Sequence, residues 1–245
     1  MTARLALPPL YRPVVLTDAG ADAETRARAG ALARDGAEAG TFVWRPDAVR
    51  LDCAVVLRPE EEVDRVLPVV LVAVLALSDA IGAVGPPAVA LDLVWPGTVR
   101  VNGGVAGGVA VDLAPGAGPR DIPDWAVVAA DIRIAPDPGI EGGERPDVTC
   151  LAAEGFAGVT ARELAEAFAR YLLVWMDRWD DEGLAPVARH WLHRATARHR
   201  DTVLLLGNEL IAGSVESLDN AGNLHLETGK GPRRLTLEAW WRAGS

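Results

Sequence analysis

The feature that most constrains this fold is an apolar run of 12 residues from Val66 to Leu77, interrupted only by Pro68. Ser78 and Asp79 follow the run, and because a bilayer crossing takes about 20 apolar residues, it is too short to span a membrane. A segment that is apolar on every side must be enclosed, which predicts a buried helix that starts near Pro68 or is kinked there. With 245 residues, of which 50% are apolar, the chain can supply the surrounding core.

The charge limits the classes of partner that we expect, and the cysteine content indicates the cellular compartment. The formal net charge is -10, so the chain has no broad electrostatic footprint for nucleic acid or an anionic membrane, and we expect neither as a partner. Its two cysteines, Cys53 and Cys150, form no C-x-x-C pair and no disulfide framework. The N-terminus lacks the apolar core of a signal peptide. These features predict a cytoplasmic protein.

An Asn-Gly pair marks the clearest local structure. Asn102-Gly103 separates two apolar alternating segments, which predicts a β-hairpin with strands over 98–102 and 105–113. Leu91–Trp95 is expected to form the strand before it, ended by Pro96. Further strands are predicted at 14–16, 41–44, 50–57 and 125–134, and a loop at 136–146.

Helices are predicted around these strands. An Ala-, Arg- and Glu-rich stretch predicts a helix over 22–39, ended by Gly40. Thr160 and Glu163 have the spacing of a capping box, followed by apolar residues at helical spacing up to Trp179. A further helix is expected at 185–200. Glu60, Glu61 and Glu62 are placed to load the first turn of the apolar helix, as the helix dipole prefers.

The C-terminal stretch changes to short strands. Segments 203–206, 210–217, 224–228 and 235–238 are strand-like, and turn residues at 219–222 and 229–232 separate them. Four or five short strands in about 45 residues indicate a small β-barrel that leans on a larger partner. The chain is therefore expected to divide into a domain at 1–198 and a small one at 199–245.

Three motifs, in order along the chain, carry a resemblance to a known family. Trp95-Pro96 is followed by Asn102-Gly103 and a glycine-bearing strand, and this segment resembles the core signature of the biotin/lipoate A/B protein ligase family. Segments 181–186 and 206–224 are similar to that family's stretch after its last core helix and to its C-terminal SH3-like domain. Because the pieces keep the same order, the resemblance covers about residues 10–240.

The resemblance implies both a fold and an activity. The implied fold is α/β, a biotin/lipoate ligase-like mixed β-sheet backed by helices with a small C-terminal SH3-like β-barrel, and without the DNA-binding arm of repressor-type members. The implied activity attaches biotin, lipoate or octanoate to a lysine of a biotinyl or lipoyl carrier domain. ATP with Mg²⁺, and biotin or lipoate, are the implied ligands.

The sequence departs from the family at its cationic positions. The family's basic loop is reduced to segment 40–45, and Val94 stands where a lysine precedes Trp-Pro. Gly97-Thr98 replaces Asn-Asp, the hairpin lysine is missing, and the later Gly-x-Gly-Ile-Asn strand end reads Ala129-Ala130-Asp131-Ile132-Arg133. Lys230 is the only lysine in the chain.

Adenylation needs cations against the triphosphate and against the attacking carboxylate. Arg45, Arg100 and Arg133 are the candidate cationic substitutes, although an arginine meets phosphate with a fork rather than a point charge. Two hypotheses follow. The chain is a divergent ligase or acyltransferase, which could use a preactivated acyl donor; alternatively, it is a catalytically inactive module that binds the acyl cofactor or the carrier protein.

The remaining candidates each have a plainer alternative, such as core packing or a tight hairpin. Cys150 is a candidate acyl-thioester nucleophile, although a structural cysteine is favoured. His190, His193 and His199 are placed on a solvated basic helix rather than at a metal, and no metal site is predicted. The substrate-binding residues that the resemblance implies are Gly40, Thr41, Phe42, Trp44, Arg45, Trp95, Pro96, Thr98, Asn102, Gly103, Gly107 and Gly108.

Overall fold

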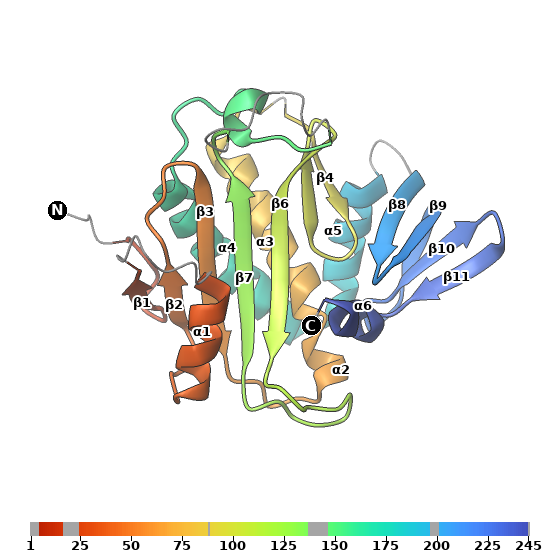
Figure 1. Cartoon of the computed structure of the whole chain (residues 1–245), viewed down its shortest axis with the longest axis horizontal. Helices are drawn as coiled ribbons and strands as arrows, with labels where there is room; N and C mark the ends of the chain where they lie inside the picture. The colour runs from red at the N-terminus through yellow and green to blue at the C-terminus, as the bar shows by residue number, and fades with distance from the viewer. Residues whose placement is uncertain (1–4, 17–24, 88, 137–146, 197–200, 245) are drawn as a thin grey trace.

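The structure is a computed structural model that describes residues 5–16, 25–87, 89–136, 147–196 and 201–244. Its larger part is a seven-stranded mixed sheet in the order β1-β2-β3-β7-β6-β5-β4 (Figure 1). Only the β1–β2 pair is parallel among these described strands. The strands are β1 (Arg12–Val15), β2 (Thr41–Trp44), β3 (Arg50–Leu57), β4 (Leu91–Val94), β5 (Thr98–Val101), β6 (Gly104–Leu113) and β7 (Ala126–Arg133). The predicted mixed α/β sheet is confirmed.

The apolar run forms α3 (Val69–Val84), which lies behind the sheet beside α4 (Ala161–Glu182) (Figure 1). Pro68 is the N-cap of α3, and a separate turn, α2 (Val63–Val66), precedes it, as the position of the proline predicts. The stretch Val63–Val84 is long and apolar enough to cross a membrane, but 83% of its apolar window is buried inside the fold. It is the central core helix.

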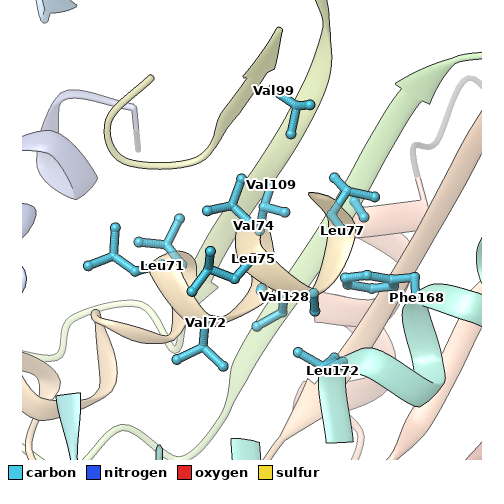
Figure 2. Close-up of a cluster of buried hydrophobic side chains, with 14 of the residues drawn as sticks. Leu71, Val72, Val74, Leu75, Leu77, Val99, Val109, Val128, Phe168 and Leu172 are labelled. Atoms are coloured by element: carbon cyan, nitrogen blue, oxygen red, sulfur yellow. The ribbon is translucent and has the colours of Figure 1, made fainter. Parts of the chain in front are cut away.

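Figure 2 shows the side chains of α3 gathered with Val109 and Val128 of the sheet and with Phe168 and Leu172 of α4. The capping box is confirmed, because Thr160 accepts a hydrogen bond from the Glu163 backbone and the Glu163 carboxylate accepts one in return. Burial of this cluster is the main source of stability for the sheet, at about 25 cal/mol per Å² of apolar surface.

The opposite face of the sheet is covered only in part, by α1 (Thr25–Arg34). Ala29 and Ala33 of this helix pack against Val43, Val56 and other small side chains in a second, smaller core. The helix is shorter than predicted, because the chain leaves it through Gly36 at φ 92° and Ala37 closes the end by donating to the Leu32 carbonyl. The predicted residues before Thr25 include positions outside the described residues.

The C-terminal part contains α5 (Leu184–Thr196) and an antiparallel sheet in the order β11-β10-β9-β8. Its strands are β8 (Asp201–Leu206), β9 (Glu209–Leu218), β10 (Leu224–Thr228) and β11 (Gly231–Leu235). Among the described residues this sheet is open, so closure into a barrel is not confirmed. Most of the predicted 136–146 loop and the end of the predicted 185–200 helix lie outside the described residues.

The prediction of a strand over 235–238 is wrong. The last strand ends at Leu235, and α6 (Leu237–Ala243) follows. The Thr236 side chain accepts a hydrogen bond from the Ala239 backbone, as an N-cap does, so a threonine that looked strand-like instead starts a helix.

The two parts are joined at the Trp-Pro motif. Trp95 Nε1 donates to the Gly222 carbonyl at 3.1 Å, and Trp191 Nε1 of α5 donates to the Pro96 carbonyl at 3.3 Å. Gly222 has φ 77°, and a β-carbon there would lie 2.9 Å from side-chain atoms of Leu71 and Leu237. The β9–β10 turn is therefore wedged against α3, which fixes the small sheet to the large one.

Candidate functional site

Strand alternation sorts charged side chains onto the sheet face opposite α3. Leu51, Cys53 and Ile132 point into the large core, so their neighbours Arg50, Asp52, Asp131 and Arg133 lie on the other face. Val99 and Val101 likewise place Thr98 and Arg100 there. In Figure 1, α1 lies in front of the lower part of β3 and beside β7, whereas the upper parts of these strands and β6, β5 and β4 have no described helix in front of them. We call this uncovered charged region the polar face.

Strand register brings these residues into two neighbouring rows. In one row, Asp52 is opposite Asp131, Asp131 is opposite Gly108, and Gly108 is opposite Thr98. In the neighbouring row, Arg50 of β3 is opposite Arg133 of β7. Toward the β4 edge of the sheet, Arg100 of β5 lies between Val105 of β6 and Asp92 of β4. Arg100 and Arg133 therefore lie toward the same end of the sheet. Arg45 follows β2, and its backbone N–H donates to the Asp52 carbonyl at 3.1 Å.

Aspartates form ion pairs with some of these arginines. Arg50 makes a two-pronged contact with Asp131, with Nε–Oδ2 and Nη2–Oδ1 distances of 3.1 and 2.5 Å. Arg45 Nε lies 3.7 Å from Asp52 Oδ2, and Thr25 of α1 donates its hydroxyl to the same carboxylate. Burial raises the pKa of Asp52, and repulsion from Asp131 adds to it, against the lowering effects of Thr25 and Arg45. The polar face thus mixes both signs of charge.

Arg100 lies near the other edge of the sheet, beside the small sheet. Its Nε is buried and has no hydrogen-bond partner within the described structure. Its side chain lines a cavity of about 220 Å³ between the β4–β5 hairpin and the small sheet. Asp92, Trp95, Trp191 and Asp201 are also in the wall. A buried N–H without an acceptor is energetically unfavourable, so the hydrogen bonding of this guanidinium is incomplete within the described residues.

The glycines of β6 are explained by neighbouring backbone. A β-carbon at Gly107, where φ is 151°, would lie 2.1 Å from the Asp131 carbonyl oxygen, and one at Gly108 would lie 2.3 Å from that of Gly97. Asn102 and Gly103 have φ of 48° and 92°, the backbone that the Asn-Gly hairpin predicts. Strand packing and turn geometry therefore already require these glycines.

Asn102 braces the hairpin. Its side chain accepts from the Ala90 N–H at 3.2 Å and donates to Glu154 at 2.7 Å. Glu154, in the 3₁₀ turn Leu151–Glu154, also accepts from Thr149 at 2.6 Å. This network connects Asn102 to the chain around Cys150 rather than to the polar face.

The predicted aromatic wall lies on the other side of the sheet. Phe42 and Trp44 point into the large core, where the Phe42 ring meets Tyr11 edge-on at 5.5 Å. Gly40 and Thr41 are buried at the start of the same strand. Trp95 and Pro96 are buried at the contact between the two sheets. The structure therefore brings Thr98, Arg45, Arg100 and Arg133 to the polar face and places the aromatic residues elsewhere.

Cysteine and histidine are set apart from this face. Cys150 is buried after a short segment in which Thr149 donates to the Val105 carbonyl at 3.0 Å. His190 meets the Trp175 ring at 5.3 Å, and burial, helped by Arg178, Arg194 and Arg189, lowers its pKa. Among the described residues, no group of three or more His, Cys, Asp or Glu could hold a metal; His199 lies outside them.

Several residues of the polar face were not singled out from sequence. Arg50, Asp52 and Asp131 are all in strands that were predicted correctly, and Thr25 lies in the predicted helix. The sequence signal that could have identified them is a charged residue at alternate positions of an otherwise apolar strand. Asp52, between Leu51 and Cys53, is an example. Their convergence depends on the β3–β7 register, which sequence spacing does not reveal.

Comparison with known proteins agrees with this architecture. Residues 7–193 match the biotin/lipoate A/B protein ligase family. A biotin–[acetyl-CoA-carboxylase] ligase of Paracoccus denitrificans is 32% identical over 188 residues, covering 75% of this chain and 76% of that protein. A biotin protein ligase-like protein of unknown function from a Silicibacter species superposes with a TM-score of 0.83 at 29% identity, over 96% of this chain and 97% of that one.

More distant structures share the fold. Biotin protein ligase from Aquifex aeolicus in complex with biotin and ATP has a TM-score of 0.70 at 17% identity, over 91% of this chain and 95% of that one. The mixed sheet with its core helices and attached small sheet is thus the fold of biotin protein ligases. The chain belongs to the biotin/lipoate A/B protein ligase family.

Proposed function

We propose that this chain is a protein ligase that activates biotin with ATP and attaches it to a lysine of a biotin carrier domain. The observation that carries the proposal is the 32% identity, over three quarters of both chains, with a biotin–[acetyl-CoA-carboxylase] ligase. The Aquifex ligase of the same fold binds biotin and ATP, which supports these two ligands here. The missing family lysine is the observation in favour of an inactive binding module, and the identity with a ligase outweighs it.

The proposed reaction has two steps. The carboxylate of biotin attacks the α-phosphorus of ATP and displaces pyrophosphate, which forms a biotinyl-adenylate. The amine of the carrier lysine then attacks the acyl carbonyl, and AMP leaves. Both steps develop negative charge on oxygen, which fixed donors in a water-poor site stabilise.

Arginine supplies the cations in this proposal. Arg100, with its buried Nε facing no acceptor, is placed to meet a phosphate or carboxylate oxygen at the edge of the polar face. Arg133 and Arg45 lie on the same face as further cations; Arg45 lies beside Asp52, and Arg50 is engaged with Asp131. The planar guanidinium can bind two oxygens through two parallel hydrogen bonds in a fixed geometry, whereas a lysine ammonium acts as a compact point charge. This is how we account for a ligase in which no lysine precedes Lys230.

Magnesium accompanies ATP in this scheme. Mg²⁺ is usually held by substrate phosphates, water and only one or two carboxylates, so a dedicated protein cage is not required. Asp92 and Asp201 are the carboxylates that line the same cavity as Arg100. We further propose that the small C-terminal sheet corresponds to the SH3-like domain of the family and that the protein acts in the cytoplasm on a carrier domain.

The test is a reconstitution with the purified full chain. Biotin, ATP and Mg²⁺ are mixed with a biotin carrier domain, while pyrophosphate release and carrier mass are followed. The proposal expects pyrophosphate release and a carrier heavier by one biotinyl group. Parallel reactions contain lipoate or octanoate, and a third contains biotinyl-adenylate without ATP. Modification only from the adenylate would replace the ligase by an acyltransferase, and binding of biotin without any turnover would refute the proposal.

A further inference from the structure

A second, larger groove lies on the helical side of the molecule, away from the polar face. It has a volume of about 1570 Å³ and runs between the chain from Leu57 to Val69 and the second half of α4. The start of α5 and the β9–β10 turn close one end. Because α3 and α4 pack on the face opposite Arg100 and Asp131, the groove is separated from the proposed ligase site by the sheet.

The floor of the groove is apolar and partly exposed. Leu57, Leu173, Met176 and Trp179 are half-buried, and all four pack against the large core. Val174 on α4 is 60% exposed, and Leu10 at the other margin is 62% exposed. Isolated exposed apolar residues are common, but here they flank a continuous apolar depression, which is typical of a contact surface.

The rim of the groove is acidic. Its carboxylates are Glu60, Glu61, Glu62, Asp64, Asp177 and Asp180, against the three arginines Arg58, Arg65 and Arg120. Arg58 is occupied, because its guanidinium donates to the carbonyls of Ala33, Ala37 and Asp124. Arg65 Nε lies 3.9 Å from Glu61. Negative charge therefore remains in excess around the apolar floor.

The three glutamates do not serve the helix that they precede. The first helix after them, α2, is a single turn of four residues, and its N-cap Glu62 makes no side-chain capping bond. The expectation that Glu60, Glu61 and Glu62 stabilise the long apolar helix is therefore wrong, since α3 starts beyond Pro68. Apart from the contact between Glu61 and Arg65, local structure gives these carboxylates no role, although they line the same groove.

We propose that this groove docks a basic polypeptide segment of a partner protein, with apolar side chains on the floor and Lys or Arg side chains against the rim. The volume exceeds the roughly 300–1,000 Å³ of typical small-molecule sites, so a stretch of polypeptide suits it better. Opposite charge on the two surfaces steers the encounter and fixes the orientation, while the apolar floor supplies affinity. A segment of mixed apolar and cationic side chains meets both requirements at once.

The experiment uses the full chain and three short synthetic peptides. In the first peptide, leucines recur at helical spacing and lysines fill the positions between them. The second peptide replaces every lysine by glutamate. The third keeps the lysines but replaces every leucine by serine. Binding is followed by fluorescence anisotropy at low and at physiological salt. The proposal expects saturable binding of the first peptide only, with affinity that falls as salt rises.

Charge reversal tests the location. The double variant Asp177→Lys, Asp180→Lys is expected to weaken binding about tenfold, equivalent to about 1.4 kcal/mol. The matched control Glu216→Lys, Glu227→Lys changes net charge by the same amount at exposed positions of the small sheet and should change the affinity less than about twofold. Val174→Ser, at an exposed position that folding does not need, should also weaken binding severalfold.

Several outcomes would overturn the proposal. Equal weakening by the control pair would mean unspecific attraction to an acidic protein, and equal binding of the serine peptide would mean that the apolar floor plays no part. Self-association of the chain by light scattering that disappears in Asp177→Lys, Asp180→Lys would assign the groove to a second copy instead. Failure of all three peptides to bind would remove the docking function.

Discussion

The two faces of the seven-stranded sheet differ in almost every physical respect. The face under α3 and α4 is apolar throughout, and twelve residues of α3 are buried on it. The other face is apolar only beneath α1, and beyond that helix it bears arginine, aspartate and threonine. Complete burial on one side supplies the stability that allows charged groups to be held close together on the other. The ligase chemistry is therefore expected on the face that contributes least to folding.

The largest expected effect is on the apolar face. Leu75→Ala removes a fully buried side chain at the centre of α3, and we expect a loss of about 3 kcal/mol in the free energy of unfolding. Urea denaturation followed by circular dichroism measures it. Leu210→Ala, at a residue that is 72% exposed on the small sheet, is the matched control and should change stability by less than about 0.5 kcal/mol. Similar losses in both variants would refute the central role of α3.

The next effect is on the polar face, in activity rather than stability. Arg100→Met keeps a long side chain but removes the cation, and should lower biotin-dependent pyrophosphate release by about 100-fold, as loss of one transition-state donor does. Arg34→Met, an exposed arginine at the end of α1, is the control and should retain the full rate. An undiminished rate in Arg100→Met would move the chemistry away from the edge of the polar face.

The contact between the two sheets gives a smaller effect. Gly222→Ala combines an unfavourable positive φ with close contacts to Leu71 and Leu237, so it should destabilise the protein by about 2 kcal/mol. Gly116→Ala has a similar φ of 87° but open space around it, and should cost about 1 kcal/mol. Comparing the stability of the two variants by thermal unfolding separates the effect of the close contacts with Leu71 and Leu237 from the effect of backbone strain. Equal losses would show that the side-chain contacts are unimportant.

The smallest expected effects concern Asp52 and Asp219, whose contributions to stability should change with pH in opposite directions. Burial and Asp131 raise the pKa of Asp52, so its ionised form opposes folding, and stability from this group falls as pH rises through that pKa. Asp52→Asn should therefore stabilise the protein at neutral pH, and the gain should vanish in acid.

Asp219 is expected to behave in the opposite way. Its pKa is lowered to about 2; burial opposes this, but hydrogen bonds from Asn223, Ala221 and Arg234 outweigh it. Its stabilisation is present above the ordinary carboxyl pKa of 3.8 and is lost as pH falls toward 2. Asp219→Asn should then destabilise the protein at pH 7 by about 1–2 kcal/mol and converge with the parent chain in acid. Unfolding measured across this pH range checks both variants; parallel pH profiles would contradict the difference.

Local features were predictable where a few neighbouring residues decide them. The Asn102-Gly103 turn, the capping box at Thr160 and the break at Pro68 all follow from backbone geometry that acts over four residues or fewer. The strand expected at 235–238 failed for a related reason. Thr236 suits both a strand and an N-cap, and the hydrogen bond to Ala239 decides between them.

The sequence by itself determined most of the strands and helices, the buried central helix and the family, because periodicity, turn residues and motif order are properties of the linear chain. It also identified Arg45, Arg100 and Arg133 as the available cations by the absence of lysine. Only the tertiary structure decided that Phe42, Trp44 and Trp95 pack into the core or between the sheets, while Asp52, Asp131 and the arginines share one face. Packing of the whole sheet sets the direction of each side chain and the register of each strand. These two properties bring together residues that are far apart in sequence.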